Sequence, residues 1–119
     1  MKKLINLLSV VLVLYTLVAC EYAKIYPDMP SPSTPVLYAT QIQPIFNSGC
    51  TCHRAGGPVP DLVAGSSYES LMSNNLVVAG NAASSILYQK VSSGTMSSYC
   101  DATQAGLIKN WINQGALNN

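Results

Sequence analysis

The residues best suited to chemistry lie together in Gly49–His53, which reads Gly-Cys-Thr-Cys-His. Cys50 and Cys52 offer two thiols, and His53 is the only histidine in the chain. A cysteine pair that ends in Cys-His is how c-type haem is attached and ligated, although that motif is C-x-x-C-H and this one is C-x-C-H. We therefore expect His53 to be the proximal iron ligand, beside a motif that is one residue short.

The start of the chain indicates export. Two lysines precede an apolar stretch, Leu7–Leu14, that is too short to span a membrane comfortably. Leu17–Cys20 resembles the bacterial lipobox, where the signal is cut before a cysteine that is then acylated. Residues 1–19 are predicted to be a lipoprotein signal peptide and Cys20 the lipidated N-terminus, anchored on the periplasmic or cell-surface side of a bacterial membrane. Ordinary cleavage that leaves Cys20 as a free thiol is the alternative.

The mature chain is one small domain behind a tether. Removing 19 of the 119 residues leaves 100, which bury only a marginal core unless a cofactor fills it or a disulfide staples it. Residues 20–37 hold four prolines among Ser and Thr and predict an extended tether, with the domain proper at 38–119. Charge is sparse and mixed, so no nucleic-acid partner is expected. The mature basic side chains are Lys24, Arg54, Lys90 and Lys109, and the acidic ones are Glu21, Asp28, Asp61, Glu69 and Asp101.

The remaining cysteines allow two layouts. In the first, which we favour, Gly49 occupies the place of the missing first cysteine, Cys52 forms the one thioether to haem, and Cys50 forms a disulfide with Cys100. That bridge would close a loop of about fifty residues, worth on the order of 4 kcal/mol in the chain-entropy model. In the second, both Cys50 and Cys52 bond the haem and Cys100 stays free or crosslinks to a partner.

Two readings without haem are also possible. In one, a Cys50–Cys100 disulfide staples a haem-free exported lipoprotein that acts as a binding or interaction module, and His53 is simply exposed. In the other, the three cysteines and His53 form a zinc site, although adjacent ligands are geometrically awkward and exported thiols oxidise. No enzymatic activity is expected, because the chain has no second histidine as a base and no serine in a nucleophile elbow.

The apolar pattern predicts a mostly α domain of about four short helices joined by irregular loops, and no segment requires a strand. Thr40 can cap the first helix, with Pro44 in its first turn, and Ser66 or Ser67 can start the second. Asn81 is a good N-cap for the third, and the last is expected over 103–114, ending at Gly115. Phe46 and Trp111 are expected to pack where the first and last helices meet.

Motifs along most of the mature chain resemble small exported c-type cytochrome domains of planctomycete and Bacteroidetes multidomain proteins and lipoproteins. The resemblance implies four short helices around one haem c, with the N- and C-terminal helices crossing. It further implies electron transfer to redox partner proteins, with His53 as the proximal and Met96 as the distal iron ligand. Arg54 and the tyrosines Tyr68, Tyr88 and Tyr99 could hydrogen-bond a haem propionate. In that family proline commonly follows the methionine, whereas Ser97 does here. The matching segments are Ile42–Phe46, Cys52–His53, Ser67–Tyr68, Val78–Asn81, Ser85–Leu87, Gly94–Met96, Ile108–Ile112 and Gly115–Ala116.

Overall fold

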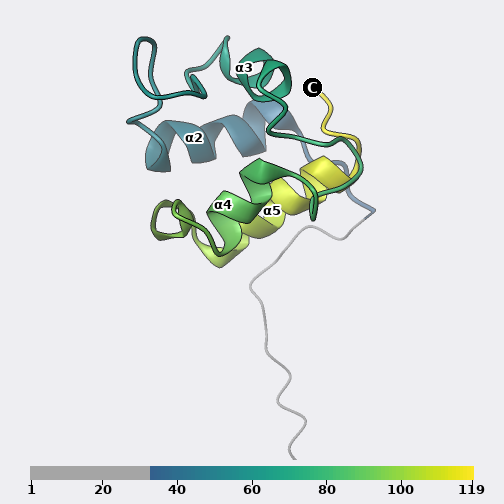
Figure 1. The fold of residues 1–119 in the computed structure, drawn as a ribbon. Coiled ribbons are helices and arrows are strands. Elements are labelled where there is room, and N and C mark those ends of the chain that lie inside the picture. The colour runs from purple at the N-terminus through teal and green to yellow at the C-terminus, as the bar shows by residue number, and fades with distance from the viewer. Residues whose placement is uncertain (1–32) are drawn as a thin grey trace, which may run out of the picture.

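The computed structural model describes residues 33–119. The predicted signal peptide, Cys20 and most of the predicted tether lie outside the described residues. The described part is mostly helical, as expected, and contains no strand. Its elements are a π-helical turn η1 (Tyr38–Ile42), helices α2 (Gln43–Gly49), α3 (Ser67–Ser73) and α4 (Ile86–Ser92), a 3-10 turn η2 (Ser97–Tyr99) and helix α5 (Ala102–Asn113) (Figure 1).

The first helix begins at Tyr38, so the prediction that Thr40 caps it is wrong. The backbone N–H of Leu37 donates to Gln41 Oε1 (2.8 Å), and that of Tyr38 donates to Asn119 Oδ1 (2.9 Å). These side chains satisfy N–H groups that a capping residue would otherwise serve. The wide turn η1, in which Gln43 N–H donates to the Tyr38 carbonyl, leads directly into α2 and brings Pro44 into its first turn. Proline is tolerated there because it has no N–H to donate.

The third helix also starts later than predicted. Asn81 does cap a turn, since its Oδ1 accepts the Ser84 N–H (3.1 Å), but α4 begins only at Ile86. The cause is Ser85, which is fully buried and hydrogen-bonds the backbone of Val78 and Asn81. Those bonds hold Ser85 in extended backbone, with a ψ of 120°, and delay the helix by several residues.

The second and last helices agree more closely with the sequence pattern. Ser66 occupies the N-cap position of α3, as expected, but its hydroxyl does not cap the helix and donates instead to the Val63 carbonyl (3.2 Å). Helix α5 begins one residue before the predicted 103, because Asp101 accepts the Gln104 N–H (2.8 Å) while Gln104 Oε1 accepts the Asp101 N–H (3.0 Å), a reciprocal capping box. The helix ends just before Gly115, whose positive φ of 103° reverses the chain, as predicted.

Aromatic side chains fill the contact between the first and last helices. Phe46 and Trp111 are both almost fully buried, and the Tyr38 ring lies between them, with centroid distances of 6.4 Å to Phe46 and 5.1 Å to Trp111. The Tyr38 hydroxyl donates to Ser67 Oγ (2.7 Å), and Ser67 in turn donates to Gln43 Oε1. This buried network fixes η1 and α2 against α3.

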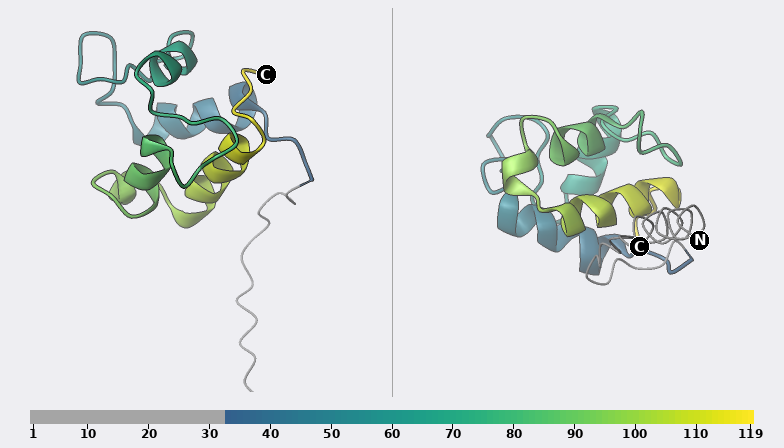
Figure 2. Two further views of the ribbon diagram at one scale, coloured as in Figure 1. Left: turned by 45° about the vertical axis from the view of Figure 1, so that its right-hand side comes forward. Right: turned by 90° about the horizontal axis from the view of Figure 1, so that it is seen from below.

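Two loops lie at the same end of the molecule as a result. Helices α4 and α5 lie side by side, and α2 runs past them toward the loop 50–66 (Figure 1). Figure 2 shows the loop after α2 and the loop after α4 at this shared end. The first carries Cys50 and His53 and the second carries Met96, so the fold brings the predicted ligand-bearing segments together.

Candidate functional site

A cavity of about 390 Å³ lies between these two loops. Cys50 and His53 line it from the first loop, and Met96 lines it from the second. Most of the remaining wall is aliphatic, including Leu62, Leu76, Leu87 and Val91. A cavity of this size with apolar walls and a few polar groups is typical of a cofactor or small-molecule site. Residues that the sequence separates by more than forty positions therefore share one cavity.

The imidazole of His53 is held in one tautomer. Its Nδ1 lies 3.1 Å from the Pro58 carbonyl oxygen and 3.1 Å from the Pro60 carbonyl oxygen. Carbonyl oxygens only accept hydrogen bonds, so Nδ1 carries the proton, and in the neutral imidazole the lone pair is on Nε2. A backbone carbonyl on the second ring nitrogen is a common support for a metal-binding histidine. The Nε2 atom of His53 is therefore available to coordinate a metal ion.

Backbone contacts hold the loop around His53. The Leu62 N–H donates to the His53 carbonyl (2.7 Å), and the His53 N–H donates to the Cys50 carbonyl (2.9 Å). Gly57 packs so closely that an added Cβ would lie 2.7 Å from the Cys52 carbonyl oxygen. The glycine- and proline-rich sequence thus folds back on Cys50–His53, and its carbonyls point at the imidazole.

The Met96 side chain is positioned from the end of α4. Its backbone N–H donates to the Lys90 carbonyl (3.1 Å), which returns the loop to the last turn of that helix. Gly94 permits this close return, because an added Cβ would lie 2.8 Å from Lys90 Cα. The half-buried Met96 side chain packs against the core and lines the cavity. These contacts take the place of the proline that the resemblance leads one to expect after Met96.

The three cysteines of the described part are free thiols in different settings. Cys50 is half-buried and lines the cavity, Cys52 is exposed and lies outside the cavity wall, and Cys100 is buried. Gly49 touches the backbone of Tyr99, since an added Cβ would lie 2.3 Å from the Tyr99 carbonyl oxygen. Cys50 directly follows Gly49 and Cys100 directly follows Tyr99, so this backbone contact places the two cysteines near each other. The Cys50–Cys100 disulfide and the choice of thioether cysteine stay predictions.

Burial lowers the reactivity of two of these thiols. Burial first, and then the charges of Cys50 and Asp101, raise the pKa of Cys100 to about 11. Burial, and then the charge of Cys52, raise the pKa of Cys50 as well. Because the thiolate is the nucleophile, both thiols react slowly near neutral pH unless a base assists their deprotonation.

The donor set and the walls of the cavity suit a haem. Haem iron takes imidazole and thioether ligands, and both groups line this cavity together with a thiol. Aliphatic walls match the apolar face of a tetrapyrrole. The zinc alternative has less support, because within residues 33–119 no three His, Cys, Asp or Glu side chains form a group that could hold a metal ion.

The residues that the sequence suggested for the propionates do not line the larger cavity. Arg54 lines a smaller cavity of about 220 Å³, which shares Cys50, His53 and Leu62 with the larger one. The Tyr68 hydroxyl donates to the Ala116 carbonyl (3.0 Å), and neither Tyr88 nor the exposed Tyr99 lines the larger cavity.

The structure instead adds Asn74 and Lys90 to the cavity wall. Lys90 could have been found from its spacing, because Ile86, Leu87, Lys90 and Val91 fall on one helix face.

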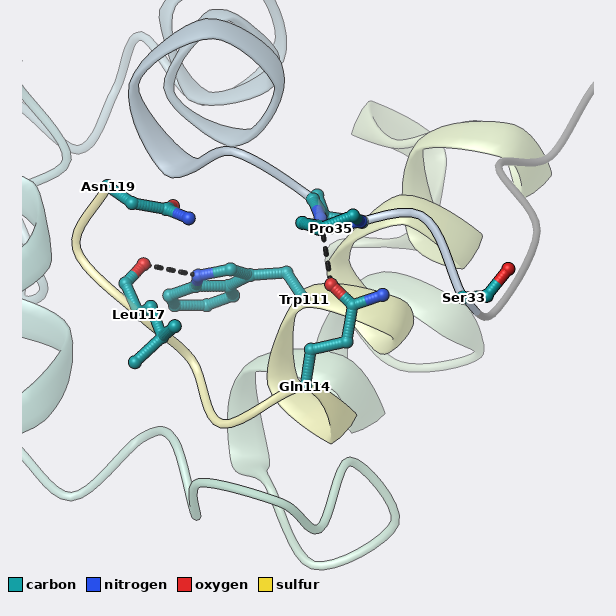
Figure 3. Close-up of a pocket in the computed structure, with 7 residues that line it drawn as sticks. Ser33, Pro35, Trp111, Gln114, Leu117 and Asn119 are labelled. Atoms are coloured by element: carbon teal, nitrogen blue, oxygen red, sulfur yellow. Dashed lines mark hydrogen bonds between the residues drawn. The ribbon is translucent and has the colours of Figure 1, made fainter.

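A third cavity, of about 250 Å³, lies between the N-terminal segment and the end of α5 (Figure 3). Trp111 Nε1 donates to the Leu117 carbonyl there (2.8 Å), and Gln114 Oε1 accepts the Val36 N–H (2.7 Å). Among residues 33–119, its lining contains no cysteine, histidine or methionine. The candidate ligands His53 and Met96 therefore line the cavity of about 390 Å³ and not this one.

Comparisons with models of known protein families, with curated proteins and with solved structures gave no match for this chain. Among residues 33–119, no helix has the length and apolar character needed to cross a membrane.

Proposed function

We propose that this chain is an exported c-type cytochrome, anchored through a lipid on Cys20, that transfers single electrons between redox partner proteins. The observation that carries the proposal is the shared cavity: His53, with Nδ1 hydrogen-bonded to carbonyls, and Met96 line one apolar space beside a thiol. The arrangement of a cytochrome c, with crossing terminal helices around one haem, is part of the same proposal.

The residues have separate roles. When bound, haem supplies a one-electron iron couple. The Pro58 and Pro60 carbonyls accept from His53 Nδ1 and orient the ring so that a neutral imidazole presents the lone pair of Nε2 to the cofactor. A Met96 thioether raises the reduction potential relative to a second nitrogen ligand, and the aliphatic walls keep water away from the iron. Cys52, Cys50 or both hold the group covalently.

The first experiment tests for haem. The full chain is expressed in a bacterial host that carries c-type haem maturation genes, and the purified protein is examined by intact mass and by a pyridine haemochrome spectrum. We expect a covalent adduct, and the position of the α band distinguishes one thioether from two. Cys50→Ser and Cys52→Ser, measured separately, show which thiol carries it. Absence of haem there and in native membranes would refute the proposal and leave the disulfide-stapled binding lipoprotein.

The second experiment tests the distal ligand with a matched pair of variants. Met96 and Met72 are both half-buried and pack against the core, but only Met96 lines the cavity. Met96→Leu is expected to lose the spectral signature of methionine ligation and to lower the reduction potential. Met72→Leu should keep both properties of the parent. Equal spectra for the two variants would exclude Met96 as a ligand.

A further inference from the structure

The cavity wall has one charged residue. Among the residues of the described part that line it, Lys90 is the only one with a formal charge, and no aspartate or glutamate shares the wall. Asn74, at the end of α3, is a polar neighbour on the same wall. Any ligand that fills this space therefore meets aliphatic side chains over most of its surface and a single cation at Lys90.

The Lys90 backbone is held in place while its ammonium is available. Its carbonyl accepts the Met96 N–H, and Gly94 packs against its Cα, so the position of the residue is tied to the Met96 loop. Within residues 33–119 the ammonium forms no ion pair or hydrogen bond. Lys90 also lies in the last turn of α4, where a positive charge is favourable. A cation that is fixed at its base and lacks an anionic partner suits an incoming carboxylate.

We propose that Lys90 binds a carboxylate on the edge of the ligand that fills the cavity. The inference rests on the proposed function, in which that ligand is haem and the carboxylates are its two propionates. The ligand class is a flat apolar molecule that carries acid groups on one edge. Lys90 then has two roles: its backbone carbonyl positions Met96, and its side chain orients the porphyrin. Asn74 supplies an amide on the same wall.

The test uses ligands that cannot form thioethers. Ferric mesoporphyrin IX has ethyl groups in place of vinyl groups, and its dimethyl ester has no free carboxylate. Both are titrated, in the same detergent buffer, into the full chain purified without haem. The variants are Lys90→Gln, Lys90→Arg and, as a matched control, Lys109→Gln, which removes an exposed lysine of α5 that does not line the cavity.

We expect Lys90→Gln to weaken binding of the diacid by about 3- to 10-fold, the range of a partly exposed charged contact, and to leave the ester unchanged. Lys90→Arg should retain binding of the diacid, and Lys109→Gln should match the parent. Equal weakening of diacid and ester by Lys90→Gln, or the same loss in Lys109→Gln, would overturn the inference and leave the proposed function standing. If the parent binds neither porphyrin, this inference fails, and the proposed function is decided by the intact mass and haemochrome spectrum of the exported protein.

Discussion

Gly49 offers a direct test of how the two loops of the site are joined. The α2 helix ends at Gly49, and an added Cβ would lie 2.3 Å from the Tyr99 carbonyl oxygen. Gly49 has no positive φ, so the substitution Gly49→Ala changes only the space that the residue needs. Helix propensity alone predicts that alanine stabilises this position by up to about 1 kcal/mol. The contact with Tyr99 predicts the opposite sign.

The size of the effect follows from that contact. Ordinary van der Waals contact begins at 3.4 Å, so the helix end and the Tyr99 backbone must separate by about 1.1 Å, the difference between 3.4 and 2.3 Å. Overpacking of this kind costs about 1 to 3 kcal/mol, and a backbone atom cannot rotate away as a side chain can. After the gain in helix propensity, we expect a net loss of roughly 1 to 2 kcal/mol. For a domain of this size the melting temperature then falls by about 5 to 15 °C.

Urea denaturation of the full chain, followed by circular dichroism, measures the change. Ser48→Ala is the control, because it alters the preceding, exposed helix position and should change stability by no more than about 0.5 kcal/mol. The reasoning is refuted if Gly49→Ala is as stable as the parent or more stable. The result also bears on the haem motif: Gly49→Cys would complete C-x-x-C-H, but its Cβ would meet the same carbonyl.

Three further predictions concern the Met96 loop, Cys100 and the core. Gly94→Ala would bring a Cβ to 2.8 Å from the α4 backbone and should lower the reduction potential of the haem-loaded protein by displacing Met96, whereas Ser93→Ala should not. In the haem-free, reduced protein at about pH 8, iodoacetamide should modify exposed Cys52 and spare folded Cys100. The folded protein raises the Cys100 pKa to about 11, so the unfolded chain loses the thiol proton at lower pH than the folded protein does. The free energy of unfolding that the protonated Cys100 thiol contributes is therefore fully present below about pH 9 and is lost as the pH rises to about 11. Urea denaturation at several pH values measures this decline. Trp111→Phe removes the indole donor to a backbone carbonyl and should cost about 1 to 2 kcal/mol; an unchanged urea midpoint would contradict that role.

Local patterns in the sequence predicted the elements whose causes are local. The capping pair of α5 lies within four residues, and the glycine that reverses the chain after it is adjacent to the helix end. Elements set by distant partners were predicted less well. The start of the first helix depends on Asn119, 81 residues away, and Ser85 delays α4 by bonding the backbone of Val78.

The candidate site shows the same division. The motif indicated His53, but no local pattern shows that two loop carbonyls hold its Nδ1, because that depends on how the loop 54–60 folds back. The burial of Cys100 likewise involves a distant segment, because Tyr99, which precedes it, packs its carbonyl against Gly49. The helix spacing of Lys90 places it on the same face as Ile86, Leu87 and Val91. From sequence alone, however, a lysine at the edge of an apolar face is interpreted as a solvent-exposed residue, so its place in the cavity wall was not predicted.

The junction at the end of α5 has a mechanical consequence. Gln114 accepts the Val36 N–H (Figure 3) and donates to the Thr34 carbonyl (2.8 Å), so the first described residues are tied to the end of the last helix. A force that pulls on the chain from before residue 33 is borne by the contacts of this junction, these two bonds among them. The load then passes into the aromatic core around Trp111, and the loops that carry His53 and Met96 lie outside that path. Pulling on the N-terminal segment should therefore fray this junction before it distorts the cavity.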